Sequence, residues 1–258
     1  KKRNFMGKMT WNITNLTNLT ASLNHSYEDS GSPGMIGLYT PEATKREKFN
    51  NVKLDIEHEF SKKNSLKVYV LRRNTVLRYI DPQYPYPTDD THKSYTTSSE
   101  VQTYLLKDTL IPLTFGILVR DEDVDSTTVK RRNRTTYGGY VQQELRKVLS
   151  NNPLKLNEIL IFPAIRWDHY SDFESGLNPK IGVLASFDKG FSIRANTGKS
   201  YRARTMNDLY WPEDPYTSGN PNLEPERSID MDAGFNFLIK KPFIVPNISI
   251  LRLSTTYF

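Results

Sequence analysis

The sequence predicts an all-β protein, an antiparallel transmembrane β-barrel to which these 258 residues contribute about twelve strands. Apolar and polar residues alternate with a period of two along most of the chain, which is typical of strands between lipid and water. There is no run of 18 apolar residues, so the sequence excludes membrane-spanning helices. Short turns also alternate with long connections, as they do in membrane barrels.

The amino-acid composition excludes several kinds of site. Tyrosine is abundant, with 15 residues, as expected if aromatic rings lie at both membrane interfaces, although a tyrosine-rich soluble β-protein would look similar. Cysteine is absent, which excludes disulfides, thiolate catalysis and cysteine zinc sites. The net charge of +6 is spread along the chain except for one dense basic run at 130–134. We expect that run to be a solvated loop, with attraction of acidic ligands or lipopolysaccharide phosphates as the alternative.

The first third of the chain predicts two hairpins separated by long loops. The alternation places strands at 5–11, 19–27, 52–60 and 66–70, turns at 12–18 and 61–64, and long loops at 29–50 and 81–97.

The middle third continues the pattern. We expect strands at 98–106, 113–120, 136–149 and 154–168, short connections at 107–112 and 150–153, and a long charged loop at 121–133. Pro163 lacks a backbone N–H, so we expect a bulge or local break there. Residues 121–126 imitate the start of an EF-hand loop, but Ser126 and Arg132 stand where glycine and glutamate are needed. We therefore expect a solvated acidic loop and assign no metal ligands, with a calcium site in the loop as the alternative.

The last third holds the clearest hairpin, at 178–197, with its turn at 188–190. Ile181, Val183, Ala185 and Phe187 share its apolar face. A long insert follows, and a second alternating strand runs over 229–237, with Ile229, Met231, Ala233 and Phe235 on one face and aspartates on the other. We expect a turn at 238–247 and a last strand at 249–258.

The insert carries two motifs. The first is Asn207-Asp208-Leu209-Tyr210-Trp211-Pro212, and the second is Gly219-Asn220-Pro221-Asn222-Leu223-Glu224-Pro225-Glu226. Between two alternating strands, these segments resemble the TonB-dependent outer-membrane receptors. Arg204 stands where that family usually has proline, so the backbone there is not fixed as proline would fix it. Residues 163–168 resemble a further family segment and place Arg166 and Asp168 on one strand face.

The resemblance implies a barrel of about twenty-two strands with an N-terminal plug. Residues 1–258 would then be a partial barrel domain without the plug or the C-terminal strands, and the first and last strands should have open edges. It also implies TonB-dependent import of a large, scarce nutrient, a ferric siderophore or cobalamin, across the outer membrane of a Gram-negative bacterium. The expected partners are membrane lipid, lipopolysaccharide and TonB, which would bind a missing N-terminal segment. Nucleic acid and cofactors are not expected.

The candidate site residues are aromatic. We expect ligand contacts from Tyr84, Tyr86, Tyr210, Trp211 and Tyr216, because aromatic rings bury large areas and present polar edges to bulky chelates. The alternative is that these rings form the outer interfacial girdle. The family motif supplies Gly219, Asn220, Pro221, Leu223, Pro225 and Glu226. No catalytic motif is present, so an enzyme is not predicted.

Two other classes of protein share some of these features. A passive outer-membrane porin or a barrel adhesin would keep the strand pattern, but it has no reason to carry the motif at 219–226. A soluble β-protein that binds polysaccharide would have outward strand faces that are less uniformly apolar.

Overall fold

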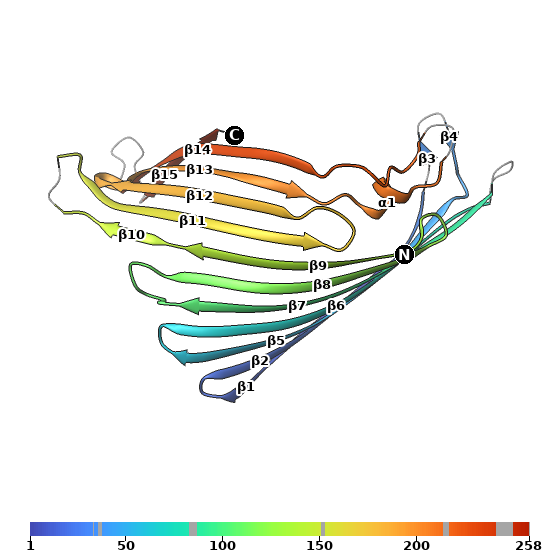
Figure 1. Ribbon diagram of the computed structural model, residues 1–258, viewed down its shortest axis with the longest axis horizontal. Coiled ribbons are helices and arrows are strands. Elements are labelled where there is room, and N and C mark those ends of the chain that lie inside the picture. The colour runs from blue at the N-terminus through green and yellow to red at the C-terminus, as the bar shows by residue number, and fades with distance from the viewer. Residues whose placement is uncertain are drawn as a thin grey trace.

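The computed structural model describes residues 1–32, 34–35, 38–82, 87–150, 153–213, 217–240 and 250–257. It shows one large, twisted antiparallel sheet (Figure 1). In chain order the elements are β1 (Lys2–Thr14), β2 (Thr17–Gly31), β3 (Gly34–Met35), β4 (Leu38–Tyr39), β5 (Thr44–Ser61), β6 (Asn64–Asp81), β7 (Thr88–Leu105), β8 (Leu113–Ser126), β9 (Lys130–Gln143), β10 (Leu145–Val148), β11 (Leu156–Tyr170), β12 (Gly176–Phe187), the 3₁₀ turn η1 (Asp188–Gly190), β13 (Phe191–Arg202), α1 (Met206–Tyr210), β14 (Glu226–Lys240) and β15 (Ile250–Tyr257). None of the helices in the described residues is long and apolar enough to cross a membrane.

The strands pair in chain order. The sheet runs β1-β2-β5-β6-β7-β8-β9-β11-β12-β13-β14-β15, with β10 pairing β11, while β3 and β4 form a small separate ribbon. Within the described residues β1 pairs only with β2 and β15 only with β14, so no hydrogen-bonded seam joins the two edges. The all-β fold and the open edges are therefore as the sequence predicts.

Three predicted long loops are wrong, because most of their residues are strand. The segment at 29–50 contains the end of β2, the ribbon of β3 and β4, and the start of β5. The segment at 81–97 belongs largely to β7, and the segment at 121–133 to β8 and β9. The strands β5, β6 and β7 each have 18 residues, whereas a tilted membrane strand needs about 9–11. In these segments most residues on both strand faces are polar, so the apolar alternation stops while backbone hydrogen bonding continues.

The sheet has one polar face and one apolar face. We call the face that carries Glu100, Arg120 and Asp168 the inner face, because it lines the main cavity. The opposite, outer face carries exposed apolar side chains along its strands, among them Val52, Leu54, Ile56, Ile117, Val119, Trp167, Ile181, Val183, Ile229, Met231 and Phe235. The predicted register of the strands at 181–187 and 229–235 is confirmed, because their apolar residues lie on the outer face.

The strand that contains Pro163, β11, is continuous, whereas the chain paired with it is divided into β9 and β10. Pro163 pairs with Ile181 inside β11, without the predicted bulge at that point. On the other side, β9 pairs with residues 164–170 of β11 and β10 pairs with residues 158–161. The ladder that β9 and β10 form with β11 is interrupted at Glu144. The interruption lies beside Pro163 of β11, which has no N–H to donate. The predicted break therefore separates β9 from β10.

Candidate functional site

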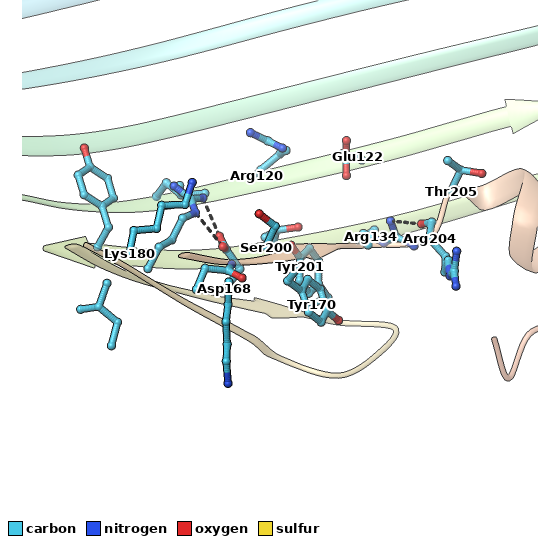
Figure 2. Close-up of a pocket in the computed structure, with 18 of the residues that line it drawn as sticks. Arg120, Glu122, Arg134, Asp168, Tyr170, Lys180, Ser200, Tyr201, Arg204 and Thr205 are labelled. Carbon is cyan, nitrogen blue, oxygen red and sulfur yellow. Dashed lines mark hydrogen bonds and ion pairs between the residues drawn. The ribbon is translucent and has the colours of Figure 1, made fainter. Parts of the chain in front are cut away.

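A cavity of about 760 Å³ lies on the inner face, where β8, β9, β11, β12 and β13 meet the segment that follows β13 (Figure 2). Its wall combines aromatic rings with both signs of charge. The lining includes Arg120, Glu122, Arg134, Tyr140, Arg166, Asp168, Tyr170, Lys180, Tyr201, Arg204 and Met206. The cavity thus offers apolar area together with hydrogen-bond donors and acceptors, which suits a bulky polar ligand.

A tyrosine bridge forms part of this wall. The Tyr140 hydroxyl donates to Glu100 at 2.7 Å, and the Tyr69 hydroxyl donates to the same carboxylate at 2.8 Å. To reach Glu100 on β7, the Tyr140 ring lies across Gly116 of β8, where a Cβ atom would meet the ring at 2.6 Å. Glycine on the intervening strand therefore lets one aromatic ring connect β9 with β7.

An ion pair and a stack of aromatic rings form the middle of the cavity wall. Arg166 donates to Asp168 through two nitrogens at 2.6 and 2.7 Å, as the same-face spacing predicts, and Asp168 is buried. Tyr170 then stacks against Phe173 and Tyr201, with ring centroids 4.5 and 5.8 Å apart. The aromatic wall comes from β11, β13 and the turn that joins β11 to β12.

Arg134 on β9 is buried at the edge of the cavity. Its Nε and Nη2 atoms donate to Asp172 at 2.8–2.9 Å, and its Nη1 donates to the carbonyl of Arg204 at 2.9 Å. Its guanidinium also lies 4.4 Å from the centre of the Phe173 ring. Figure 2 shows the link from Arg134 to Arg204 beside the start of the long loop.

The loop begins with a short helix that the sequence analysis did not predict. Thr205 caps α1: its hydroxyl accepts from the Asp208 N–H, and the Asp208 carboxylate accepts from the Thr205 N–H. This is a capping box, which satisfies two free N–H groups of the first turn. The hydrogen bonds from Thr205, its backbone N–H first, hold the pKa of Asp208 below its usual value. The stabilisation from that carboxylate is therefore present above the ordinary pKa and is lost as the pH falls through the lowered one.

The second motif folds back onto this helix. The Gly219 N–H donates to the Trp211 carbonyl at 2.9 Å, and the Asn220 N–H donates to the Asp208 carbonyl at 3.0 Å. Within the motif, Asn220 also accepts from Asn222 through its side chain and from Leu223 through its carbonyl. The residues Gly219 to Leu223 thus supply the contacts that close the loop on α1.

Arg204, at the position where the family usually has proline, ties the two ends of the loop together. Its Nε donates to the Glu224 carbonyl at 2.6 Å, and its guanidinium pairs with Glu226. Arg202 pairs with the same carboxylate at 3.1 Å. The Arg204 side chain therefore holds the loop base by hydrogen bonds, in place of the fixed φ that proline would provide.

The predicted ligand-binding aromatics have different environments. The Tyr210 ring packs on Arg132, 4.0 Å from its guanidinium carbon, so it fastens the loop to β9. Trp211 is 37% exposed, and it is not among the residues that line the cavity. Tyr84, Tyr86 and Tyr216 lie outside the described residues.

Sequence reasoning missed Arg134, Asp172, Tyr170 and Tyr201. Residues 130–134 are all polar, so alternation could not show that this stretch is strand or which of its side chains face inward. The segment that resembles an EF-hand is also strand, since residues 121–126 are the end of β8. Over the described part of the chain no group of three or more acidic or histidine side chains is placed to hold a metal ion.

Comparisons with known proteins agree with the geometry. Residues 2–258 match the model of the family described as "TonB dependent receptor-like, beta-barrel". A vitamin B12 transporter BtuB from Vibrio vulnificus is 45% identical over 89 residues, which are 34% of this chain and 14% of that protein. The corresponding transporter from Photobacterium profundum is 34% identical over 65 residues, 25% of this chain and 10% of that protein.

Solved structures share the fold at low sequence identity. The siderophore receptor PirA from Pseudomonas aeruginosa aligns with 92% of this chain and 43% of its own, at 16% identity and a TM-score of 0.69. The hemophore receptor HasR of Serratia marcescens, solved with its hemophore and heme, aligns with 99% of this chain and 45% of its own, at 12% identity and a TM-score of 0.72. The chain thus spans less than half the length of these receptors.

Proposed function

Because this chain belongs to the TonB-dependent receptor-like β-barrel family, we propose that it forms part of the wall and ligand mouth of an outer-membrane transporter in a Gram-negative bacterium. In this proposal residues 1–258 are barrel wall, while a plug domain and the segment that contacts TonB lie elsewhere. The imported molecule is a large, scarce nutrient of the ferric siderophore or cobalamin type.

The observation that carries the proposal is the cavity on the inner face, whose wall includes residues 203–206 at the start of the long loop. Figure 1 shows α1 at one end of the sheet. A transporter needs a polar lumen inside an apolar wall, and the two faces of this sheet differ in that sense along their strands. The exposed apolar side chains along the outer face do not favour a soluble polysaccharide-binding protein. The motif from Gly219 to Glu226 and the family match favour a gated receptor over a passive porin or an adhesin.

The site supports a bulky ligand with polar groups. Aromatic rings of Tyr140, Tyr170 and Tyr201 line the cavity next to arginine and lysine side chains, and Trp211 of the adjoining loop is partly exposed. Relatives of this chain transport vitamin B12 or bind siderophores and heme according to their names. We therefore take ferric siderophores, cobalamin and heme as the ligands to test. In the same proposal, lipopolysaccharide and membrane lipid surround the outer face of the sheet.

The test is uptake in cells with and without TonB. The intact protein should support growth or radiolabel uptake with at least one member of a panel of ferric siderophores, heme and cyanocobalamin. Deleting either its gene or the tonB gene should abolish that uptake. Uptake that persists without TonB would indicate a passive pore, and the absence of any effect across a broad panel would contradict the transporter proposal.

A further inference from the structure

We propose that Arg134 is a positioning residue, which fixes the loop segment of residues 203–213 across the β11–β12 turn and so sets the rim of the cavity before a ligand arrives. Its effect on ligand binding rests on the transporter function proposed above. Its effect on the loop does not, because the contacts involved are present without a ligand.

The path of the chain explains why the loop needs a contact with β9. The loop leaves β13, which is separated from β9 by β11 and β12 in the sheet order. Nevertheless, the Arg204 carbonyl accepts from Arg134 of β9, and the Tyr210 ring packs on Arg132 of the same strand. The loop therefore passes over the tip of the β11–β12 hairpin, where β11 ends at Tyr170 and β12 begins at Gly176.

Arg134 is the residue that joins all three elements at this crossing. Its side chain is only 6% exposed and that of Asp172 only 15%. Its Nε, Nη1 and Nη2 atoms all donate, to the turn residue Asp172 and to the loop carbonyl of Arg204, and Phe173 covers its guanidinium. A buried cation with this many partners is stabilised where it lies, and removing it leaves a partly buried carboxylate and a loop carbonyl without the arginine that pairs with them.

Lysine should not replace it fully. A lysine ammonium keeps the charge opposite Asp172, but it lacks the planar fork that bonds a carboxylate with one edge and a carbonyl with another. Arg131, three residues earlier on β9, provides a matched comparison. Its side chain is 79% exposed and pairs with Asp123 on β8 at 3.1 Å, so its removal deletes the same chemical group without touching the loop.

The fixed loop contributes directly to the cavity. The residues Ala203 to Met206 line it, and Leu209, on the helix that follows, is only 3% exposed. A rim that is ordered in advance does not have to be ordered by the ligand, which lowers the conformational cost of binding. Loss of the Arg134 contacts should therefore weaken ligand binding even though Arg134 itself need not touch the ligand.

The experiment measures the position of the loop by thiol labelling of the complete protein in detergent or lipid. The 258 residues contain no cysteine, so Leu209→Cys can introduce one buried thiol in this domain. In that background we expect Arg134→Ala to raise the labelling rate at least about ten-fold, Arg134→Lys to raise it less, and Arg131→Ala to leave it unchanged. Equal labelling rates in the Arg134→Ala and Arg131→Ala proteins would overturn the proposal.

A second variant covers the case in which Arg134→Ala prevents assembly. Asp172→Asn removes the charge of the partner with little change in volume, and it should raise the labelling rate of the Leu209→Cys thiol while the barrel still migrates as folded protein. A folded Asp172→Asn protein with unchanged labelling would also overturn the proposal.

Ligand binding is then measured with the probe that the uptake panel selects, ferric siderophore, heme or cyanocobalamin. Arg134→Ala should lower the affinity at least about ten-fold, Arg134→Lys should restore part of it, and Arg131→Ala should have no effect. If no probe is bound or transported, the transporter proposal fails while the labelling result still decides the role of Arg134. If labelling rises but affinity is unchanged, the loop is fixed by Arg134 but does not set the binding rim.

Discussion

Gly219 is the residue of the second motif whose identity has the clearest physical cause. A Cβ atom at this position would lie 2.4 Å from the Trp211 nitrogen and 2.8 Å from the Tyr210 nitrogen. Both are backbone atoms at the end of α1 and cannot turn aside as a side chain does. Glycine is therefore needed because two segments of backbone approach each other closely.

This predicts that Gly219→Ala opens the loop. We expect the substitution to cost about 1–3 kcal/mol of local stability, the range for forcing an extra methyl group into a packed site. Trypsin should then cut faster after Arg202, Arg204 or Arg227, which flank the loop. Gly31→Ala is the control, because nothing lies within 4 Å of a Cβ atom there. Equal cleavage of both variants would contradict this account of Gly219.

Trp211 provides a second test at the scale of one residue. We expect Trp211→Ala to weaken binding of the transported ligand by about 1–3 kcal/mol, because an aromatic contact is lost, while assembly in the membrane stays intact. Ligand titration and the heat-dependent mobility of the barrel on gels measure the two properties separately. Lost assembly with unchanged affinity would place Trp211 in the interfacial girdle instead.

At the scale of single residues, the sequence predicts contacts between residues close together in the chain better than contacts between distant ones. The separation of Arg166 and Asp168 by two residues in a strand suffices to predict that they share a face, and they form an ion pair. No comparable rule connects Arg134 with Asp172 and Arg204, which lie 38 and 70 residues away along the chain. That contact depends on the loop crossing a hairpin, and the crossing is set by tertiary structure.

In the proposed barrel, each strand has one face toward lipid and one toward the lumen. Strand β12 offers the simplest test of this arrangement. Val183 lies on its outer face among exposed apolar residues. Val183→Arg should destabilise the folded barrel by about 2–4 kcal/mol if this position lies near the middle of the bilayer. Equilibrium unfolding in lipid vesicles gives the free energy directly.

The control for that measurement is an arginine on the inner face. Asn24 of β2 pairs with Met6 and Asn51, on the polar side of the sheet. Asn24→Arg should change the free energy of unfolding far less than Val183→Arg, because its guanidinium stays in water. A similar loss in both variants would mean that the outer face does not contact lipid.

Element boundaries are the part of the fold that alternation alone could not predict. The period of two marks only the portion of a strand that separates lipid from water, and β5 to β8 continue past it as hydrogen-bonded ladder with polar residues on both faces. Proline gave a sharper signal, because the ladder breaks beside Pro163 as its missing N–H predicts. The break nevertheless appears in the partner strand, which sequence reasoning did not anticipate.

At the scale of the whole molecule, the sheet has two unlike regions, its centre and its edges. The strands β5, β6 and β7 have long partners on both sides, whereas in the part of the chain that the structure describes β1 and β15 each have a partner on one side. We expect amide hydrogens of this 258-residue chain to exchange slowly in β6 and at least about a hundred-fold faster in β1 and β15, because opening an edge strand breaks one ladder instead of two. Hydrogen exchange followed by mass spectrometry measures this, and uniform protection across the sheet would contradict the open-edged arrangement.

The overall architecture was more accessible from the sequence than the site was. Strand order follows chain order, so recognising the strands nearly determines the sheet, and the motifs at 207–212 and 219–226 predict the family. The size of the complete barrel and the position of a plug are not encoded in any residue here. The cavity depends on which inner-face side chains the twist of the sheet brings together, and alternation carries no information on that twist.

The pairing of each strand with its neighbours in the chain also has a mechanical consequence. A force applied at one terminus loads a single ladder at a time, so the sheet should come apart as a zipper does, hairpin after hairpin, instead of rupturing at once. The hairpin from Gly176 to Arg202 would release roughly 90–100 Å of chain at about 3.3–3.6 Å per residue. Extraction of this protein by a pulling probe would then appear as a staircase, each step having the length of one hairpin.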